Sequence, residues 1–249
     1  MSQRTNVPQH IAVIMDGTGR WAKARGKERL FGHLQGVEAI RKVVRGAVEQ
    51  GVKYLTLYAF STENWTRPAE EVSGLMDLIG RYAVSETPEL KRQGVRLEFI
   101  GALEGLSDEI NEAIDYCRRE TESNDRLHLV IALNYSSRSE IVTAACEIAR
   151  RAAEGVLNPE TIDEATVSEH LYTRSMPDPD LVIRTSGELR LSNFLLWQSA
   201  YAEFYFTDCF WPDFDQRELA RAIEAYGRRE RRFGGTEPAE GKTHSSTKR

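Results

Sequence analysis

The chain has 249 residues, of which 41% are hydrophobic, and its formal net charge is −5 at pH 7. This length suits one large domain with a substantial core, and the acidic total argues against a general nucleic-acid binder while still allowing local basic pockets. No segment reaches the roughly 18 consecutive apolar residues of a membrane span, and the three cysteines form no Cys-x-x-Cys pair that would indicate zinc. Unpaired cysteines are typical of a reducing compartment, so we expect a cytoplasmic protein.

The first half of the chain alternates predicted strands and helices. Apolar residues at 11–15 predict a strand buried on both faces, and the helical spacing between Leu34 and Gln50 predicts an amphipathic helix that stops at Gly51. Residues 52–60 predict a second strand. Apolar positions at 72–82 predict a second helix, which we expect Pro88 to interrupt.

The same alternation continues in the second half. Residues 95–99, 127–133 and 181–183 predict three further strands, and helical spacing recurs at 110–117 and 141–152. Asp215 and Glu218 form a capping-box pattern that opens a helix over 219–226. Residues 236–249 have no apolar periodicity, so we expect a disordered polar tail behind a single domain of residues 1–235.

This order predicts the α/β class, as a single domain with a mostly parallel central sheet flanked by helices on both faces. Ligands of such sheets bind at the carboxyl ends of the strands. Polar loops follow four of the predicted strands, and we expect them to converge on one rim: 16–20, 61–67, 134–138 and 184–192.

The first of these loops carries the clearest chemical signal. Asp16 follows the buried strand, and Gly17 and Gly19 let the backbone turn tightly and approach a ligand closely. Arg20 adds a guanidinium suited to phosphate oxygens. A carboxylate beside such an anion site favours a metal-bound phosphate or diphosphate. On this segment alone, an Asp-Gly pair that simply begins a turn remains an alternative.

Several familiar sites are absent from the sequence, among them a Gly-x-Gly-x-x-Gly loop, a Gly-Lys-Ser/Thr phosphate loop, a His-Glu-x-x-His pair and a Gly-x-Ser-x-Gly elbow. The Asp16-Gly17-Thr18 turn is similar to that of the haloacid dehalogenase phosphatases. Those enzymes need a nucleophilic aspartate two residues earlier, where Ile14 cannot form the covalent intermediate.

Five sequence blocks resemble the signature blocks of the cis-prenyltransferases, with the bacterial undecaprenyl diphosphate synthases as the best match: residues 10–23, 58–68, 180–198, 201–206 and 211–214. The resemblance extends over almost the whole chain up to Gly235. It implies the cis-prenyltransferase fold, which is not a Rossmann fold, with residues 1–235 as the catalytic domain. It also implies Mg²⁺-dependent head-to-tail condensation of isopentenyl diphosphate with an allylic diphosphate, each step making a cis double bond.

The resemblance further implies roles for individual residues. Asp16 is the essential carboxylate and binds Mg²⁺ together with Glu203, while Asn64 is linked to the final proton abstraction. The family pattern places the allylic diphosphate on Gly17, Gly19, Arg20, Arg29, His33 and Arg67, and the diphosphate of isopentenyl diphosphate on Arg184, Arg190 and Ser192. The rest of the implied substrate-binding set is Thr18, Trp21, Ser61, Thr62, Glu63, Trp65 and Leu191, with Trp21, Phe60 and Trp65 packing around the prenyl chain.

Each of these residues also has an ordinary interpretation when taken alone: His33 as a partly buried histidine, Glu203 as a surface acid and the arginines as a solvated face. Two interpretations, the lining of a product tunnel and plain core, remain open for a set of apolar residues at regular spacing: Val72, Leu75, Met76, Ile79, Leu97, Phe99 and Val130.

The C-terminal Arg232-Phe233-Gly234 matches an Arg-x-Gly motif that in the family reaches the active site of the partner subunit. The resemblance therefore implies a homodimer in which Arg232 and Gly234 complete the partner's site. For the neighbouring Arg228 and Arg229, a basic helix end that complements its own dipole is the alternative.

Three positions depart from the family pattern. Thr18 stands where the family usually has Asn, Leu189 where some relatives have a metal-binding His, and Ser136-Ser137 where Gly-Gly is usual.

Our leading hypothesis is a synthase that extends farnesyl diphosphate to undecaprenyl diphosphate, the precursor of a cell-wall lipid carrier, with only peripheral membrane contact for product release. A short-chain or irregular synthase of the lavandulyl type is a second hypothesis. A non-catalytic partner subunit is a third, disfavoured because an adaptor has no chemical need for Asp16, Arg20, Asn64, Arg184, Arg190 and Glu203.

Overall fold

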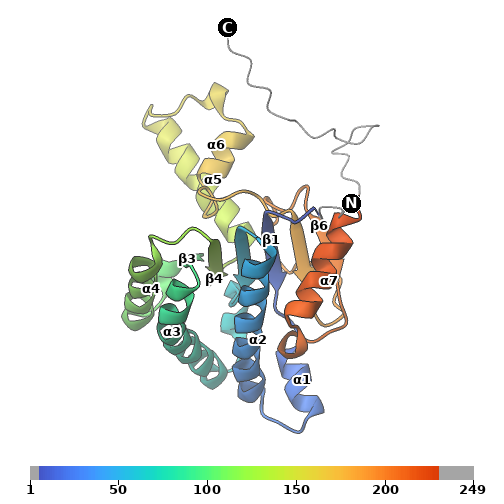
Figure 1. The fold of residues 1–249 in the computed structure, drawn as a ribbon. Helices are drawn as coiled ribbons and strands as arrows, with labels where there is room; N and C mark the ends of the chain where they lie inside the picture. The colour runs from blue at the N-terminus through green and yellow to red at the C-terminus, as the bar shows by residue number, and fades with distance from the viewer. Residues whose placement is uncertain (1–5, 230–249) are drawn as a thin grey trace.

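The computed structural model describes residues 6–229, in which six parallel strands form one sheet (Figure 1). The strand order is β3-β4-β2-β1-β5-β6, which differs from the 3-2-1-4-5-6 order of the Rossmann fold. The predicted α/β class with a parallel sheet is therefore confirmed. The strands are β1 (His10–Ile14), β2 (Tyr54–Tyr58), β3 (Val95–Ile100), β4 (Leu127–Ala132), β5 (Leu181–Arg184) and β6 (Glu203–Phe206).

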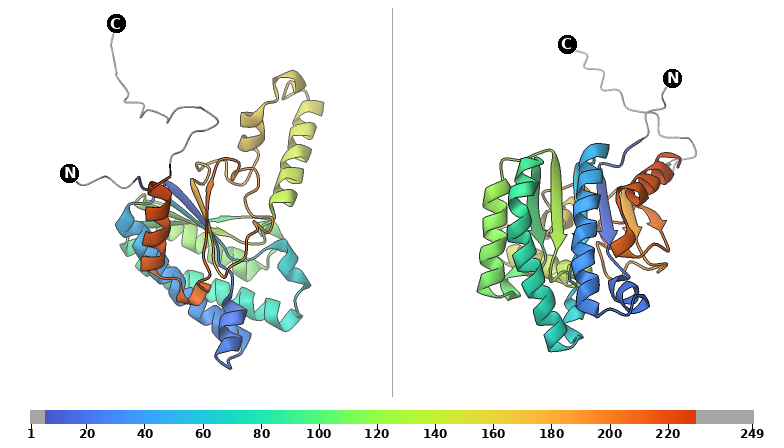
Figure 2. Two further views of the ribbon diagram at one scale, coloured as in Figure 1. Left: turned by 90° about the vertical axis from the view of Figure 1, so that its right-hand side faces the viewer. Right: turned by 60° about the horizontal axis from the view of Figure 1, so that its bottom comes forward.

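The described part of the chain contains seven α-helices: α1 (Thr18–Ala24), α2 (Arg29–Gln50), α3 (Ala69–Arg92), α4 (Asp108–Thr121), α5 (Ser137–Ala153), α6 (Glu164–Glu169) and α7 (Gln216–Gly227). Helices α2, α3, α4 and α7 pack side by side on one face of the sheet (Figures 1 and 2). Helices α5 and α6 project beyond the opposite side of the sheet (Figure 2).

Alternate strand residues divide the core between the two faces, because successive side chains of a strand point in opposite directions. Ile11 and Val13 of β1 pack under the helical layer, in a cluster that includes residues of α2, α3, α4 and α7. Ala12 and Ile14 face the other way, where Tyr135, Phe194 and other residues of loop segments cover them. Loop segments, rather than the helices that we expected on both faces, therefore form the cover of this second face.

Three local predictions differ from the structure. Helix α3 continues through Pro88 to Arg92, because Pro88 is exposed and the hydrogen bond that it cannot donate is lost on the solvent side. The segment after Gly17 forms the short helix α1 instead of a loop, and α2 begins at Arg29, five residues before the predicted start at Leu34. Strand β6 was not predicted from periodicity, because its four residues are only partly buried at the sheet edge.

His10 opens β1 and is held at both ring nitrogens. His10 Nδ1 lies 2.7 Å from the Pro177 carbonyl oxygen, and His10 Nε2 lies 2.7 Å from Thr56 Oγ1. Since a carbonyl oxygen can only accept, Nδ1 carries the proton and Nε2 accepts from the Thr56 hydroxyl. Burial lowers the pKa of His10 to about 4, so the folded protein holds this ring neutral.

Acidification from pH 7 to pH 5 is expected to lower the free energy of unfolding. The unfolded chain binds a proton on His10 below about pH 6.5 and the folded chain does not do so until about pH 4. The loss at pH 5 is about 2 kcal/mol for this one histidine. Urea unfolding curves at the two pH values measure it, and His10→Asn should reduce the pH dependence. Equal unfolding free energies at pH 7 and 5 would contradict the assignment.

Within residues 6–229, no helix has both the length and the apolar character needed to cross a membrane.

Candidate active site

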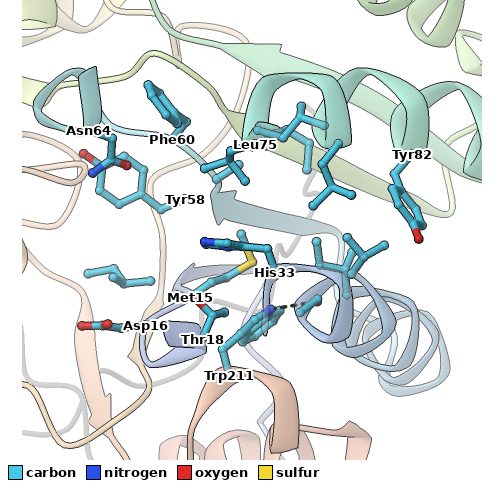
Figure 3. Close-up of a pocket in the computed structure, with 18 of the residues that line it drawn as sticks. Met15, Asp16, Thr18, His33, Tyr58, Phe60, Asn64, Leu75, Tyr82 and Trp211 are labelled. Atoms are coloured by element: carbon cyan, nitrogen blue, oxygen red, sulfur yellow. Dashed lines mark hydrogen bonds between the residues drawn. The ribbon is translucent and has the colours of Figure 1, made fainter. Parts of the chain in front are cut away.

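A cavity of about 800 Å³ opens at the carboxyl ends of β1, β2 and β5 and extends between the sheet and helices α2 and α3. Its two ends differ in chemistry (Figure 3). Asp16 and Asn64 lie at the polar end, whereas Tyr82 of α3 lies at the apolar end. Such a cavity suits a ligand with a charged head and a long apolar body.

The loops after β1, β2 and β5 meet at the polar end, as predicted for the carboxyl ends of parallel strands. The predicted site residues that line the cavity are Asp16, Gly17, Thr18, Gly19, Arg20, Arg29, His33, Ser61, Asn64, Arg67, Arg184 and Ser192. The fourth predicted loop, 134–138, does not line the cavity but supports the second loop, since Trp65 Nε1 donates to Asn134 Oδ1 at 2.8 Å.

Asp16 is fixed at the end of β1 by its neighbours in the sheet. Ile14 pairs with Arg184 across the β1–β5 ladder, so the two strands end at the same level of the sheet. There Asp16 Oδ2 accepts a hydrogen bond from Arg184 Nη2 at 2.8 Å. Its Oδ1 accepts the Gly17 N–H at 2.6 Å. Burial alone would raise the pKa of Asp16, but the hydrogen bond and charge of Arg184, with help from Gly17 and Arg20, lower it below its usual value. The carboxylate is therefore ionised at neutral pH.

Gly17 is required by both its backbone angle and its surroundings. Its φ is +99°, and a Cβ at this position would lie 2.6 Å from Phe210 Cδ1 and 2.8 Å from Ser186 Cβ. Only glycine fits such a site without strain. The chain then enters α1, which presents Thr18, Gly19 and Arg20 to the cavity.

Arg184 is the central cation of the site. Its side chain is only 4% exposed, and its Nη1 donates to Ser192 Oγ at 2.6 Å and to the Arg190 carbonyl oxygen at 2.5 Å. Its Nε has no hydrogen-bond partner among the described residues. Arg184 thus ties the loop after β5 to Asp16 and retains one unpaired donor.

More basic side chains line the cavity beside α2 and the second loop. Arg29 and Arg67 each approach Glu71, at 3.1 and 3.2 Å, so two guanidinium groups share one carboxylate. His33 Nε2 is buried without a partner among the described residues. Burial and the nearby Arg67 charge lower the pKa of His33 to about 4, so this ring is neutral and available as a hydrogen-bonding group.

The second loop is a 3₁₀ helix, η1 (Thr62–Thr66), closed by a capping box in which Asn64 Oδ1 accepts the Ser61 N–H at 3.1 Å. This contact holds Asn64 at the cavity wall. Trp65 packs edge-on against Phe60 with ring centroids 5.1 Å apart, and the Phe60 side chain lines the cavity.

The seven apolar residues for which a product tunnel and plain core were both considered do not all lie at the cavity. Leu75, Ile79, Leu97 and Phe99 line the cavity. Val72 and Met76 belong to the core of the helical layer, and Val130 lies on the opposite face of the sheet. Val72, Met76 and Val130 are therefore plain core, whereas the other four pack in or against the core and also line the cavity, so their role in a product tunnel stays a prediction.

Several predicted substrate-binding residues lie outside the cavity lining: Trp21, Thr62, Glu63, Trp65, Arg190 and Leu191. Trp21 is buried, with its Nε1 donating to Asp213 at 2.8 Å, and Arg190 is largely exposed beside Glu188. Leu189, at the position where some relatives have a histidine, is also exposed.

The structure does not bring Glu203 next to Asp16 within one chain. Glu203 begins β6 and pairs with Leu181, whereas Arg184 pairs with Phe206. Along the strands, Glu203 therefore lies three residues, or about 10 Å, before the level of Arg184. Its carboxylate instead accepts from Arg229 Nη1 at 2.6 Å. Among residues 6–229, no group of three or more His, Cys, Asp and Glu side chains could hold a metal. Arg232 and Gly234 lie outside the described residues.

Sequence reasoning missed several cavity residues, including Tyr58, Lys23, Lys27 and Trp211. Lys23 lies four residues after Gly19 on α1, so helical spacing would have placed it on the cavity side had α1 been expected. Trp211 is fixed in η4 (Trp211–Asp213) by a 3.0 Å hydrogen bond from its Nε1 to the Gly36 carbonyl oxygen. No local pattern in the sequence indicates that contact between distant segments.

Comparison with known proteins gives a consistent result. A family model described as "Putative undecaprenyl diphosphate synthase" matches residues 14–234. Isoprenyl transferases from Agrobacterium fabrum and Heliobacterium mobile are 52% and 53% identical over 93% and 92% of this chain, and the matches cover 94% and 88% of those proteins.

Two solved structures are also similar over most of their length. The crystal structure of lavandulyl diphosphate synthase from Lavandula x intermedia, in complex with dimethylallyl diphosphate, has a TM-score of 0.89 at 39% identity and covers 92% of this chain. That of a probable undecaprenyl diphosphate synthase from Campylobacter jejuni has a TM-score of 0.75 at 34% identity and covers 91% of this chain. The matches cover 98% of each of those chains.

Proposed function

Because the chain belongs to the undecaprenyl diphosphate synthase family of prenyltransferases, we propose that it extends farnesyl diphosphate with isopentenyl diphosphate to undecaprenyl diphosphate, with Mg²⁺ as cofactor. The observation that carries this proposal is the single cavity that joins a cationic rim around Asp16 to a long apolar wall. One ligand with a diphosphate head and an isoprenoid tail would satisfy both ends.

The chemistry of the transfer accounts for the cations at the rim. Cleavage of the allylic carbon–oxygen bond leaves an allylic cation and a diphosphate anion, so the site must stabilise growing negative charge. We assign the allylic diphosphate to Arg20, Arg29, His33 and Arg67 together with the backbone of Gly17 and Gly19. Arg67 and Arg29 already share one carboxylate, which leaves a net positive charge for the ligand.

The second diphosphate, that of isopentenyl diphosphate, is assigned to Arg184, Ser192 and Arg190. The unpaired Nε of Arg184 supports this, because a buried donor without a partner is costly and a phosphate oxygen would accept from it. The new bond forms between the allylic carbon and the isopentenyl double bond, after which one proton leaves. The neutral amide of Asn64 is a poor base, so we assign that proton to the departing diphosphate, with Asn64 orienting the group that loses it.

Asp16 is the proposed Mg²⁺ ligand. Mg²⁺ takes oxygen ligands and is usually bound through one or two carboxylates together with substrate phosphates, and the ionised Asp16 carboxylate fits this pattern. When bound, the ion would neutralise charge on the leaving diphosphate. Glu203 could join this site only from another chain, since the start of β6 lies away from Asp16.

A homodimer is proposed on the exposed edge of β6. This strand is last in the sheet order, and its outer side has no partner strand within residues 6–229. Phe206 and the adjacent Tyr201 are exposed there, and unprotected apolar edge strands are usually covered by another element or a second subunit. We also propose a cytoplasmic location, membrane contact limited to product release, and no nucleic-acid partner.

Replacing Ala83 with Phe is expected to shorten the products. Ala83 lines the cavity and follows Tyr82 in α3, so a phenyl ring there would occupy space that a growing chain needs. Sizing the extracted products by thin-layer chromatography checks this, with Ala153→Phe on the exposed end of α5 as the matched control. Unchanged product length in the Ala83 variant would exclude this end of the cavity as the product-binding region.

The lavandulyl-type alternative is kept because the Lavandula structure is similar to this chain over nearly its whole length. Short or branched products from wild-type protein would favour it. Absence of product with every allylic primer would instead favour the non-catalytic partner subunit.

A further inference from the structure

Asn193 follows Ser192 in the loop after β5 and lies where three of the polar loops meet. Its φ is +62°, in the left-handed region that asparagine tolerates better than most residues. All of its side-chain hydrogen-bonding groups are used by other segments. Nδ2 donates to Glu63 Oε1 at 2.8 Å and to Ser136 Oγ at 2.7 Å, and Oδ1 accepts from the Arg138 N–H at 2.9 Å.

One part of this arrangement is structural. Helix α5 begins at Ser137, and the Ser136 side chain makes no capping hydrogen bond to it. The first two N–H groups of the helix donate instead to Asn193, from Ser137 to its backbone oxygen at 2.9 Å and from Arg138 to its Oδ1. Asn193 therefore caps α5 from a distant part of the chain.

The other part of the arrangement concerns the cavity. Nδ2 of Asn193 holds Glu63, which lies in η1 next to Asn64. Partial burial would raise the pKa of Glu63, but the hydrogen bond from Asn193 lowers it, which keeps the acceptor ionised. On the other side of Asn193, Ser192 Oγ accepts from Arg184, which in turn holds Asp16. One amide thus joins the loop that carries Asn64 to the loop that carries Ser192.

We propose that Asn193 is a positioning residue for prenyl transfer, which sets the loop after β2 against the loop after β5 so that the two bound substrates are aligned. The inference rests on the proposed function, because the two loops are those assigned to the two substrates. Displacing a reacting group by about 1 Å can lower a rate about a hundredfold, so a side chain that touches neither substrate can control the rate in this way.

The variant Asn193→Asp separates the two roles. A carboxylate at this position keeps an oxygen acceptor for Arg138 and suits the N-terminus of α5, so the helix cap is retained. It loses the Nδ2 donor and places a second negative charge against Glu63. The variant Asn193→Asp/Glu63→Gln restores a donor–acceptor pair with reversed polarity, because the Gln amide can donate to the new carboxylate.

The experiment measures kcat and KM for both substrates, and amide hydrogen exchange over residues 62–67 and 137–140, in the wild type and the Asn193→Asp, Glu63→Gln and double variants. Asn158→Asp is the control, because Asn158 caps η3 (Pro159–Thr161) away from the cavity and Asp caps equally well. For Asn193→Asp we expect kcat to fall at least about tenfold with smaller changes in KM, and exchange to rise over 62–67 but not over 137–140. The double variant should recover most of both losses.

A kcat within about twofold of wild type in Asn193→Asp, or a double variant no faster than Asn193→Asp, would overturn the inference. So would faster exchange confined to α5, which would leave only the structural cap. If the wild type makes no product, the proposed function fails, and the exchange measurement alone then decides whether Asn193 holds the loop after β2.

Discussion

Replacing Asp16 with Ala is expected to lower the rate of prenyl transfer about a thousandfold while the fold is retained. Asp16 is the ionised carboxylate at the polar end of the cavity, and it is both the proposed Mg²⁺ ligand and the counter-charge of the buried Arg184. Steady-state turnover with saturating farnesyl and isopentenyl diphosphates measures the loss, and circular dichroism checks the fold.

We also expect Asp16→Ala to change how Mg²⁺ affects the binding of a diphosphate. Without metal, the carboxylate repels a diphosphate, so Asp16→Ala should bind farnesyl diphosphate no more weakly than wild type in the presence of chelator. Mg²⁺ should tighten diphosphate binding by the wild type but not by Asp16→Ala. Calorimetry measures both affinities. Asp77→Asn, an exposed carboxylate on α3 that pairs with Arg81, is the matched control. Unchanged turnover in Asp16→Ala would exclude the assigned mechanism.

Replacing Arg184 with Lys is expected to lower kcat/KM for isopentenyl diphosphate about a hundredfold. Arg184 contacts Asp16, Ser192 and the Arg190 carbonyl oxygen through two nitrogens, and its third, Nε, has no partner among residues 6–229. A lysine has one compact ammonium and cannot reproduce this fork, so the charge is conserved while the geometry is lost.

The control for this prediction is Arg81→Lys, since Arg81 is exposed on α3 and forms an ion pair with Asp77. Initial rates at varied isopentenyl diphosphate, with the allylic substrate saturating, give the change in kcat/KM. An Arg184→Lys enzyme with wild-type kcat/KM would show that the buried guanidinium does not bind the second diphosphate.

Much of this fold follows from patterns that are local in the sequence. The apolar run at 11–15 and the helical spacing from Leu34 depend only on side-chain periodicity, so β1 and most of α2 could be predicted. The order β3-β4-β2-β1-β5-β6 depends on which strands pair, and no single segment encodes that choice. Strand β6 is short and half-exposed, so it lacks the apolar run that marked the others.

The site divides in the same way. Asp16 and Gly17 follow β1 and Arg184 is the last residue of β5, and their convergence could be predicted from the parallel sheet. The separation of Leu97 from Val130 could not, because one side chain faces the cavity and the other the opposite side of the sheet, and the register decides this. The contacts of Asn193 with Glu63 and Arg138 join segments far apart in the chain, so they emerge only from the folded structure.

The central claim is tested most directly by incubating the purified full-length protein with farnesyl diphosphate, labelled isopentenyl diphosphate and Mg²⁺, with and without a chelator, and sizing the extracted products. We expect a ladder of polyprenyl products that ends near eleven isoprene units and disappears when the chelator is added. Product formation that persists in chelator, or no product from any allylic primer, would contradict it.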